Sequence, residues 1–501
     1  MDELTSWGCQ HATDRQRNRI AQSVVDQAFD TLRPRLVAAV EQFLASPVSA
    51  SAFHGFEIAL LALIREVGRL VLQAAVQALE PDEITALPKN VYFQCGGYRR
   101  RSDRTPRRGI ATRFGNVTLW RTGYRSWQRG EATIFPLELL LGLVENVSPA
   151  LLDWIGKTTA GAGMSQQATL AAIQEQSGVS MGVKRLRACV TVLAERLEPL
   201  RQTQQVDVLL KMLENAAHSS GNRKPVLGVG RDGITLRHRV GFFEVATAAT
   251  ISVYDRAGKR LRTIHLAYRP ELGQATMDCM IRELLDELFS RWEGALPRLA
   301  YVTDSGSNEI DFFQRVLRRM KHPVTGRKLD WTRVSDFYHV SERVWAMADA
   351  LFTKEEERES AAWAERMLKN LKRPSGASRV LHSAASLLSR RTLGAARMAN
   401  FQKAYRYIQE RTAYLKYHDY QSAHIPIGSG VTEAACKTVY TQRLKLSGMR
   451  WSAEGAQRIL TLRTILLSGT WESTYGASLK QNTPTIRTYD RNAKHITRIA
   501  A

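Results

Sequence analysis

The sequence has little cysteine, a shortage of acidic residues, and no long apolar run without charges. Its 501 residues include five cysteines that are far apart and form no Cys-x-x-Cys pair, so they predict neither a disulfide framework nor a zinc ribbon. Such sparse cysteine fits a reducing cytosol. The first thirty residues lack the apolar core of a secretion signal. The most apolar run, Phe56 to Leu79, contains four charged residues and is too charged to span a membrane.

The shortage of acids leaves the chain strongly basic. It has 71 Lys and Arg against 48 Asp and Glu, a formal net charge of +23. A charge this far from zero is informative about partners rather than fold, and nucleic acid is the commonest polyanion. The alternative is a merely soluble basic protein, but here the charge also clusters. We therefore expect a cytoplasmic, nucleoid-associated protein that binds DNA.

Residues 1–87 are predicted to be helical. Apolar residues four apart over residues 15–45 predict one helix, with a kink at Pro34, and residues 52–79 predict a second. We expect this region to serve in dimerisation or DNA binding, with core packing as the alternative.

Residues 88–135 predict a small β-hairpin with an Arg-rich loop from Tyr98 to Gly109, followed by a turn at Gly115-Asn116. Arginines beside aromatic strands can contact a phosphate backbone, whereas a solvated charged loop is the alternative. The candidate DNA-binding residues are Arg99, Arg100, Arg101, Arg104, Arg107 and Arg108.

Residues 136–220 return to a helical pattern. Helices over 165–176 and 181–193, separated by a glycine turn, resemble a helix-turn-helix, and a further helix is expected over 205–217. Lys184 and Arg185 on the second helix would then contact DNA. Any two helices joined by a glycine turn look similar, so an ordinary helix pair is the alternative.

From residue 221 to 340 the pattern becomes β-β-β-α-β-α-β. This is the plan of an α/β ribonuclease-H-like core: a mixed five-stranded sheet with helices. Residues 341–424 are predicted as an all-α insertion. Residues 425–472 return to the core, and 473–501 read as a polar, loosely ordered tail.

Two aspartates are expected where buried strands end. Asp232 follows the strand Val226 to Val229, and Asp304 follows the strand Leu299 to Val302. Neighbouring carboxylates repel unless a cation lies between them, and a site made only of carboxylates suits Mg²⁺. Phosphodiester chemistry uses two such ions. The third carboxylate is expected from Glu433, which opens a helix after the glycine-rich turn that begins at Ile427.

The segment Pro426 to Trp451 contains Gly-Ser-Gly-Val-Thr-Glu-Ala-Ala-Cys-Lys, then Gln442-Arg443 and Gly448-Met-Arg-Trp. Together with Asp336-Phe-Tyr-His339, it resembles bacterial insertion-sequence transposases of the Mutator-like DDE group, especially their Kra-type branch. The resemblance implies a ribonuclease-H-like core with Asp232, Asp304 and Glu433 as metal ligands. It also implies that residues 341–424 form the all-α insertion.

The function expected from this resemblance is transposition. The enzyme would cleave transposon ends and transfer the 3′-hydroxyl into target DNA with Mg²⁺, tolerating Mn²⁺. Relatives often carry paired cysteines before the hairpin, but only Cys95 remains here, so zinc is not expected. The partners are terminal inverted repeats and target DNA, bound by a homodimer or larger synaptic assembly. The rivals are a two-metal structure-selective nuclease or resolvase and a catalytically idle, transposase-derived DNA-binding protein.

Weaker candidates surround the three acids. His339 is expected to contact the scissile phosphate or orient a carboxylate, with a structural histidine as the alternative. The remaining candidates for DNA contact have structural alternatives, namely an ion pair with Glu433, a solvated basic helix face or a half-buried tryptophan. They are Lys437, Arg443, Lys445, Arg450 and Trp451.

Overall fold

The computed structural model describes residues 5–6, 14–94, 96–237, 243–489 and 496–500. The chain divides into two compact units. Unit 1 comprises residues 1–159, 164–196 and 475–501, and unit 2 comprises 160–163 and 197–474. Cys95, on which the expectation that zinc is absent rests, lies outside the described residues.

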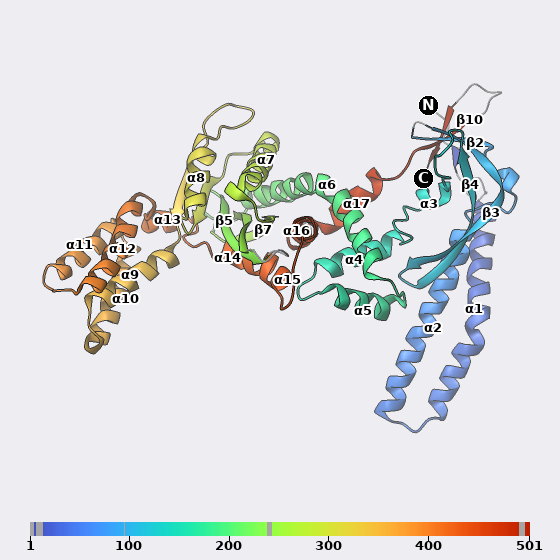
Figure 1. The fold of residues 1–501 in the computed structure, drawn as a ribbon, viewed down its shortest axis with the longest axis horizontal. Helices are drawn as coiled ribbons and strands as arrows, with labels where there is room; N and C mark the ends of the chain where they lie inside the picture. The colour runs from blue at the N-terminus through green and yellow to red at the C-terminus, as the bar shows by residue number, and fades with distance from the viewer. Residues whose placement is uncertain (1–4, 7–13, 95, 238–242, 490–495, 501) are drawn as a thin grey trace. The chain divides into compact units, whose positions relative to one another are not determined.

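Unit 1 begins with two long helices, as predicted. Helix α1 spans Asp14–Ala45 with Pro34 inside it, and α2 spans Ala50–Gln77. The Ser49 side chain accepts a hydrogen bond from the Ala52 N–H and so caps α2. The two helices lie side by side as a hairpin (Figure 1). Leu32 and Leu63 are buried between them.

The predicted β-hairpin is present, but its arginines lie in a strand and not in a loop. Strand β3 runs over Gly96–Thr112 and pairs with β4, Gly115–Ser126. Because Thr112 pairs with Gly115, the turn falls on residues 113–114, earlier than expected. The buried residues Ile110 and Leu119 belong to the core of this sheet, which holds the basic segment extended.

The described residues of the polar tail form a helix and two strands, so the prediction of a loosely ordered tail was wrong for them. Helix α17 covers Trp471–Gln481, and strands β10 (Ile486–Tyr489) and β11 (Ile496–Ala500) follow. β10 pairs with β2 (Asn90–Phe93), and the sheet order is β1-β11-β10-β2-β3-β4, with β1 at Thr5–Ser6. Ile486 is fully buried in the core of this sheet. Its burial therefore stabilises a strand whose sequence shows no periodic pattern.

Four helices connect the hairpin to unit 2. They are α3 (Pro136–Leu140), α4 (Pro149–Ala160), α5 (Gln166–Ser177) and α6 (Val183–Ala217). The two predicted helices joined by a glycine turn exist as α5 and α6, with Gly178 in the left-handed conformation at φ 69°. The expected break between the two later helices is absent, because α6 is continuous over 35 residues despite Pro199.

Unit 2 contains the predicted mixed sheet of five strands. The strands are β5 (Val226–Arg237), β6 (Phe243–Tyr254), β7 (Arg260–Tyr268), β8 (Arg298–Thr303) and β9 (Trp331–Ser335). Their order is β7-β6-β5-β8-β9. β5, β6 and β7 form an antiparallel meander, and β8 and β9 add in parallel. Helices α7 (Ala275–Arg291) and α8 (Ser307–Arg315) connect the later strands.

Alternating side chains place a core on each face of this sheet. Leu227 and Leu299 belong to one cluster, which contains residues of α7 and α8. Val226 and Ala300 belong to the other, which contains residues of the helices after β9. Since neighbouring residues of a strand point to opposite faces, these near-continuous apolar strands are covered on both sides.

The all-α insertion is present and follows β9. Its helices are α9 (Phe337–Leu351), α10 (Glu357–Leu371), α11 (Gly376–Leu388), α12 (Ala395–Arg411) and α13 (Tyr417–Ser422), of which α9 to α12 pack together (Figure 1). The chain returns through α14 (Gly430–Ala435), a π-helical turn (Cys436–Thr441), α15 (Gln442–Leu444) and α16 (Ala453–Leu467). Among the described residues, no helix has the length and apolarity needed to cross a membrane.

Candidate metal centre

Three aspartates lie at one level of three adjacent parallel strands. The paired residues of β5 and β8 end at Val229 and Tyr301, and Asp232 and Asp304 each lie three residues further along. Asp304 directly follows Thr303, and Asp336 directly follows Ser335. Thr303 and Ser335 are the last pair of β8 and β9. The parallel register therefore brings side chains that are far apart in the sequence to the same edge of the sheet.

Asp232 lies inside β5 and not at its end. The strand continues to Arg237 because its antiparallel partner β6 extends opposite it, pairing Asp232 with Ala248. The strand end that the sequence predicted near Val229 is where β5 stops pairing with β8. Its pairing with β6 continues to Arg237. Asp232 Oδ1 accepts a hydrogen bond from the Gly233 N–H at 2.7 Å, and the Cys436 thiol donates to Oδ2 at 3.4 Å.

Two acids of this edge, Asp232 and Glu309, have raised pKa values. Burial raises the pKa of Asp232, and the negative charges of Asp304 and Glu433 raise it further. Burial also raises the pKa of Glu309, with contributions from Asp304 and Asp232. The contributions of neighbouring charges to these two pKa values require the carboxylates to be near one another. A cation between them would relieve the repulsion, which is the environment expected of a metal site.

Glu433 reaches this edge because α14 packs closely on the sheet. The preceding residue, Thr432, is buried, and its hydroxyl lies 2.7 Å from that of Thr250 on β6. Gly230 of β5 makes room for Thr432, since a Cβ at residue 230 would clash with the Thr432 hydroxyl. The π-helical turn that follows α14 contains Cys436, which contacts Asp232.

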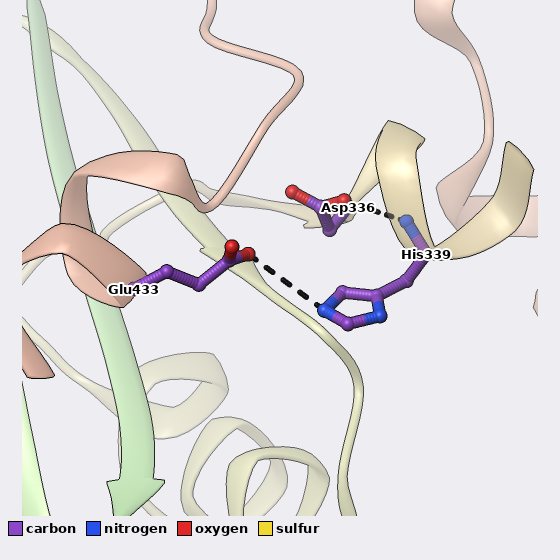
Figure 2. A group of neighbouring side chains, drawn as sticks. All are labelled: Asp336, His339 and Glu433. Atoms are coloured by element: carbon purple, nitrogen blue, oxygen red, sulfur yellow. Dashed lines mark hydrogen bonds and ion pairs between the residues drawn. The ribbon is translucent and has the colours of Figure 1, made fainter. Parts of the chain in front are cut away.

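Asp336, His339 and Glu433 form a group that could hold a metal ion. One candidate ligand atom from each residue lies within 4.8 Å of the others. Figure 2 shows the His339 ring and the Glu433 carboxylate turned toward one another, with His339 Nε2 3.7 Å from Glu433 Oε1. Asp336 is buried, His339 half-buried and Glu433 exposed. Asp232 and Asp304 are near this group but are not part of it.

The Asp336 carboxylate is also an anchor for the turn before Glu433. Its Oδ1 accepts from the His339 N–H at 2.9 Å, which caps α9. Its Oδ2 accepts from the N–H of Ser429 and from the Ser429 hydroxyl at 2.8 Å. The same hydroxyl lies 2.6 Å from Glu433 Oε1. Because Asp336 already accepts these bonds, we regard it first as a positioning residue for Glu433.

Sequence reasoning missed two neighbours of this site. Glu309 is not among the candidates predicted from the sequence, although it follows Asp304 by five residues and is buried beside it. Cys436 belongs to the motif that begins at Gly428, but the sequence predicts no role for it. A carboxylate in the first turn of a helix that follows a strand-end aspartate could have suggested Glu309. Nothing in the sequence signals the contact between Cys436 and Asp232.

The six arginines of β3 do not form one exposed row. Arg100 donates to the carbonyls of Thr85 and Leu87, and Arg107 donates to the Asn146 side chain. The remaining four differ in environment: Arg101 pairs with Asp103, Arg104 is half-buried, and Arg99 and Arg108 are exposed. Arg99 and Arg108 are therefore the better placed for a phosphate backbone.

Lys184 and Arg185 have different environments at the start of α6. Lys184 is exposed. The Arg185 guanidinium donates to the carbonyls of Glu145 and Asn146, both at 2.8 Å, so it holds that loop against α6. Only Lys184 of this pair is available for DNA as the side chains lie.

The candidate DNA-binding residues that follow Glu433 also differ in exposure. Arg443 is buried and lies over the Trp451 ring at 5.1 Å, so it does not sit on a surface where DNA could pass. Trp451 is half-buried and donates to the Leu444 carbonyl at 3.0 Å. The other three, Lys437, Lys445 and Arg450, are exposed.

The chain matches no protein-family model, and no curated protein is significantly similar to it.

Proposed function

We propose that this protein is a DNA transposase that uses divalent metal ions to cut transposon ends and join them to target DNA. The observation that carries the proposal is the meeting of Asp232, Asp304 and Glu433 at one edge of the five-stranded sheet. Asp232 and Asp304 arrive through parallel register, and Glu433 through the packing of Thr432 on Gly230. Burial raises the pKa of Asp232, and the charges of Asp304 and Glu433 raise it further, which supports this proposal.

The donor set fits a hard divalent cation. Asp232, Asp304 and Glu433 offer carboxylate oxygens, which Mg²⁺ and Mn²⁺ prefer, and Glu433 also belongs to the group with Asp336 and His339. A bound cation supplies a more acidic water and stabilises the charge on a leaving oxygen. Metal identity follows from the oxygen-rich donor set and is part of the proposal.

The residues themselves hold the reacting groups in place. Ser429 and His339 both contact Glu433 Oε1, so they restrain its carboxylate. Water displaces the 3′-oxygen at the transposon end and leaves a free 3′-hydroxyl. That hydroxyl then attacks a phosphodiester of the target, forms the new bond and releases the target's own 3′-hydroxyl. The two displacements need no covalent enzyme intermediate.

A sequence motif supports transposition over other metal-dependent reactions on DNA. The glycine-rich segment Ile427 to Glu433, which resembles Mutator-like enzymes, is also the segment that Asp336 anchors beside the acids. A ribonuclease-H-like identity for the core belongs to this proposal, supported by a meander followed by two parallel strands. The net charge of +23 supports DNA as the partner.

The test is a strand-transfer assay with Mg²⁺ on DNA that flanks the gene. Asp232→Asn, Asp304→Asn and Glu433→Gln should each lower product formation by roughly 10³-fold or more, since each removes a ligand or charge at the reacting centre. Asp330→Asn, an exposed carboxylate of unit 2, is the control and should keep wild-type activity. Wild-type activity in all three site variants would refute the assignment. Cleavage of branched DNA without strand transfer would favour a nuclease or resolvase.

A further inference from the structure

Two arginines of the all-α insertion flank one tyrosine beside the acidic site. The guanidinium carbon of Arg411 lies 3.9 Å from the centre of the Tyr407 ring, and that of Arg343 lies 5.0 Å from it. Arg411 follows Tyr407 by one turn of α12, whereas Arg343 comes from α9. A guanidinium stacked on an aromatic face is held in orientation, while the N–H groups at its edge stay available for hydrogen bonds.

This cluster is tied to the loop that carries Asp304. The Tyr407 hydroxyl donates to the Asp304 carbonyl at 2.9 Å, and Arg411 Nη2 approaches the Ser305 carbonyl at 3.5 Å. Arg343 follows His339 by four residues and so shares its face of α9. The arginines therefore lie next to the residues that we assign to the reaction.

The positive charge of the cluster is poorly matched by the protein. Within the described residues, the Nε atoms of Arg333, Arg343 and Arg411 are buried and have no hydrogen-bond partner, and no carboxylate forms an ion pair with Arg343. Arg333 is 5 % exposed and lies over the Tyr414 ring at 4.3 Å. Arg411 approaches Glu410 at 3.5 Å, but Glu410 is largely exposed, and such a pair contributes little.

Buried polar groups in folded proteins nearly always have partners, so three such nitrogens together indicate a ligand. Stacking on Tyr407 and Tyr414 accounts for the orientation of the arginines, but it leaves their Nε atoms without acceptors, although Arg411 Nη1 donates to the Tyr407 carbonyl at 3.3 Å. The ligand must be an anion with several acceptor oxygens, and planar arginine edges suit phosphate. A cation cluster beside carboxylates also offsets the repulsion between those carboxylates and a polyanion.

We propose that Arg343 and Arg411 bind a backbone phosphate of the DNA strand next to the phosphate that is cut. This inference rests on the proposed function and adds a second DNA contact, which lies on the all-α insertion. The two arginines orient the strand so that the neighbouring phosphodiester faces Asp304. Arg333, deeper in the cluster, adds positive charge behind them.

The test measures binding of a short fluorescein-labelled duplex by anisotropy, in Ca²⁺ and over a range of salt concentrations. Arg343→Ala with Arg411→Ala should weaken binding on the order of tenfold and reduce the slope of log affinity against log salt by about 1, the value for one lost phosphate contact. Arg343→Lys with Arg411→Lys should keep the slope, because it keeps both charges. The control, Arg358→Ala with Arg366→Ala, removes the same charge from exposed positions of α10 and should bind like wild type.

The outcomes separate this inference from the proposed function. If wild type binds the duplex and the Arg343/Arg411 alanine variant matches the α10 control, the phosphate site is refuted and the proposed function stands. If wild type does not bind duplex DNA, both fail. If inorganic phosphate raises the melting temperature of wild type but not of the alanine variant, while both bind the duplex equally, the site takes free phosphate and the DNA assignment is wrong. The lysine variant keeps the test valid if the alanine variant does not fold.

Discussion

Gly230 and Thr432 are in direct contact across 202 residues of chain: a methyl group on Gly230 would occupy the space of the Thr432 hydroxyl. Thr432 immediately precedes Glu433. The position of the third carboxylate thus depends on the absence of a side chain on a strand residue two places before Asp232.

Gly230→Ala should therefore reduce DNA cleavage by about 10²-fold, because a displacement of about 1 Å at a reacting group has effects of that size. It should also lower the free energy of unfolding by roughly 1–3 kcal/mol through overpacking. Adding Thr432→Ala removes the clashing hydroxyl and should restore part of the activity. A Gly230→Ala variant with full activity would show that α14 does not depend on this contact.

Asp232→Asn should stabilise the metal-free fold at neutral pH. Burial and the charges of Asp304 and Glu433 raise the pKa of Asp232, so the folded state holds the proton more tightly than the unfolded chain. The stability that the Asp232 proton contributes is present at low pH and is lost as pH rises through the raised pKa. In EDTA at pH 7, we expect a melting temperature a few degrees higher, since about 1 kcal/mol corresponds to roughly 2–4 °C in a domain of this size.

The gain should disappear below the ordinary aspartate pKa of about 4, where both states are protonated. Calorimetry at several pH values measures this. Mg²⁺ should then raise the melting temperature of wild type more than that of Asp232→Asn, because a ligand that binds only the folded state stabilises it. An equal response of the two proteins to Mg²⁺ would exclude Asp232 as a ligand.

Asp336 and Ser429 should act as one positioning unit for Glu433. Asp336→Asn and Ser429→Ala each break the bond that anchors the turn, and each should cost roughly 10–100-fold in metal affinity or activity, as changes next to metal ligands do. The double variant should lose no more than the single ones, because both remove the same interaction. Mn²⁺ titration and cleavage rates measure this double-mutant cycle. Additive losses would instead indicate that Asp336 binds metal directly.

The helical hairpin should mediate self-association. Nine large apolar side chains on α1 and α2 are exposed, and exposed apolar surface of this kind marks protein–protein interaction sites. Leu44→Glu with Leu61→Glu should convert dimers to monomers in sedimentation velocity, while Asp26→Asn on the same helix should not. A monomeric wild type would argue against this role. The nine residues are Val25, Phe29, Val37, Val40, Leu44, Phe53, Ile58, Leu61 and Ile64.

Much of the fold could be predicted because it follows from the local periodicity of apolar residues. Apolar spacing located α1 and α2, and the alternation of strands and helices predicted the five-stranded sheet and the insertion after it. Errors fell where tertiary contacts decide the outcome. Ile486 gives no periodic signal by itself, yet burial against β2 makes its segment a strand. Arg443 reads as a surface residue from its charge, but stacking on Trp451 accompanies its burial.

The same division applies to the site. By itself, the sequence determined that Asp304 follows a buried strand and that a glycine-rich turn starts the Glu433 helix, since these depend on neighbours in the chain. Only the tertiary structure decided that Asp336 anchors Ser429, that Cys436 contacts Asp232 and that Arg343 and Arg411 meet at Tyr407. Those contacts join segments from separate elements, and their distances are set by strand register and helix packing, which no local pattern encodes.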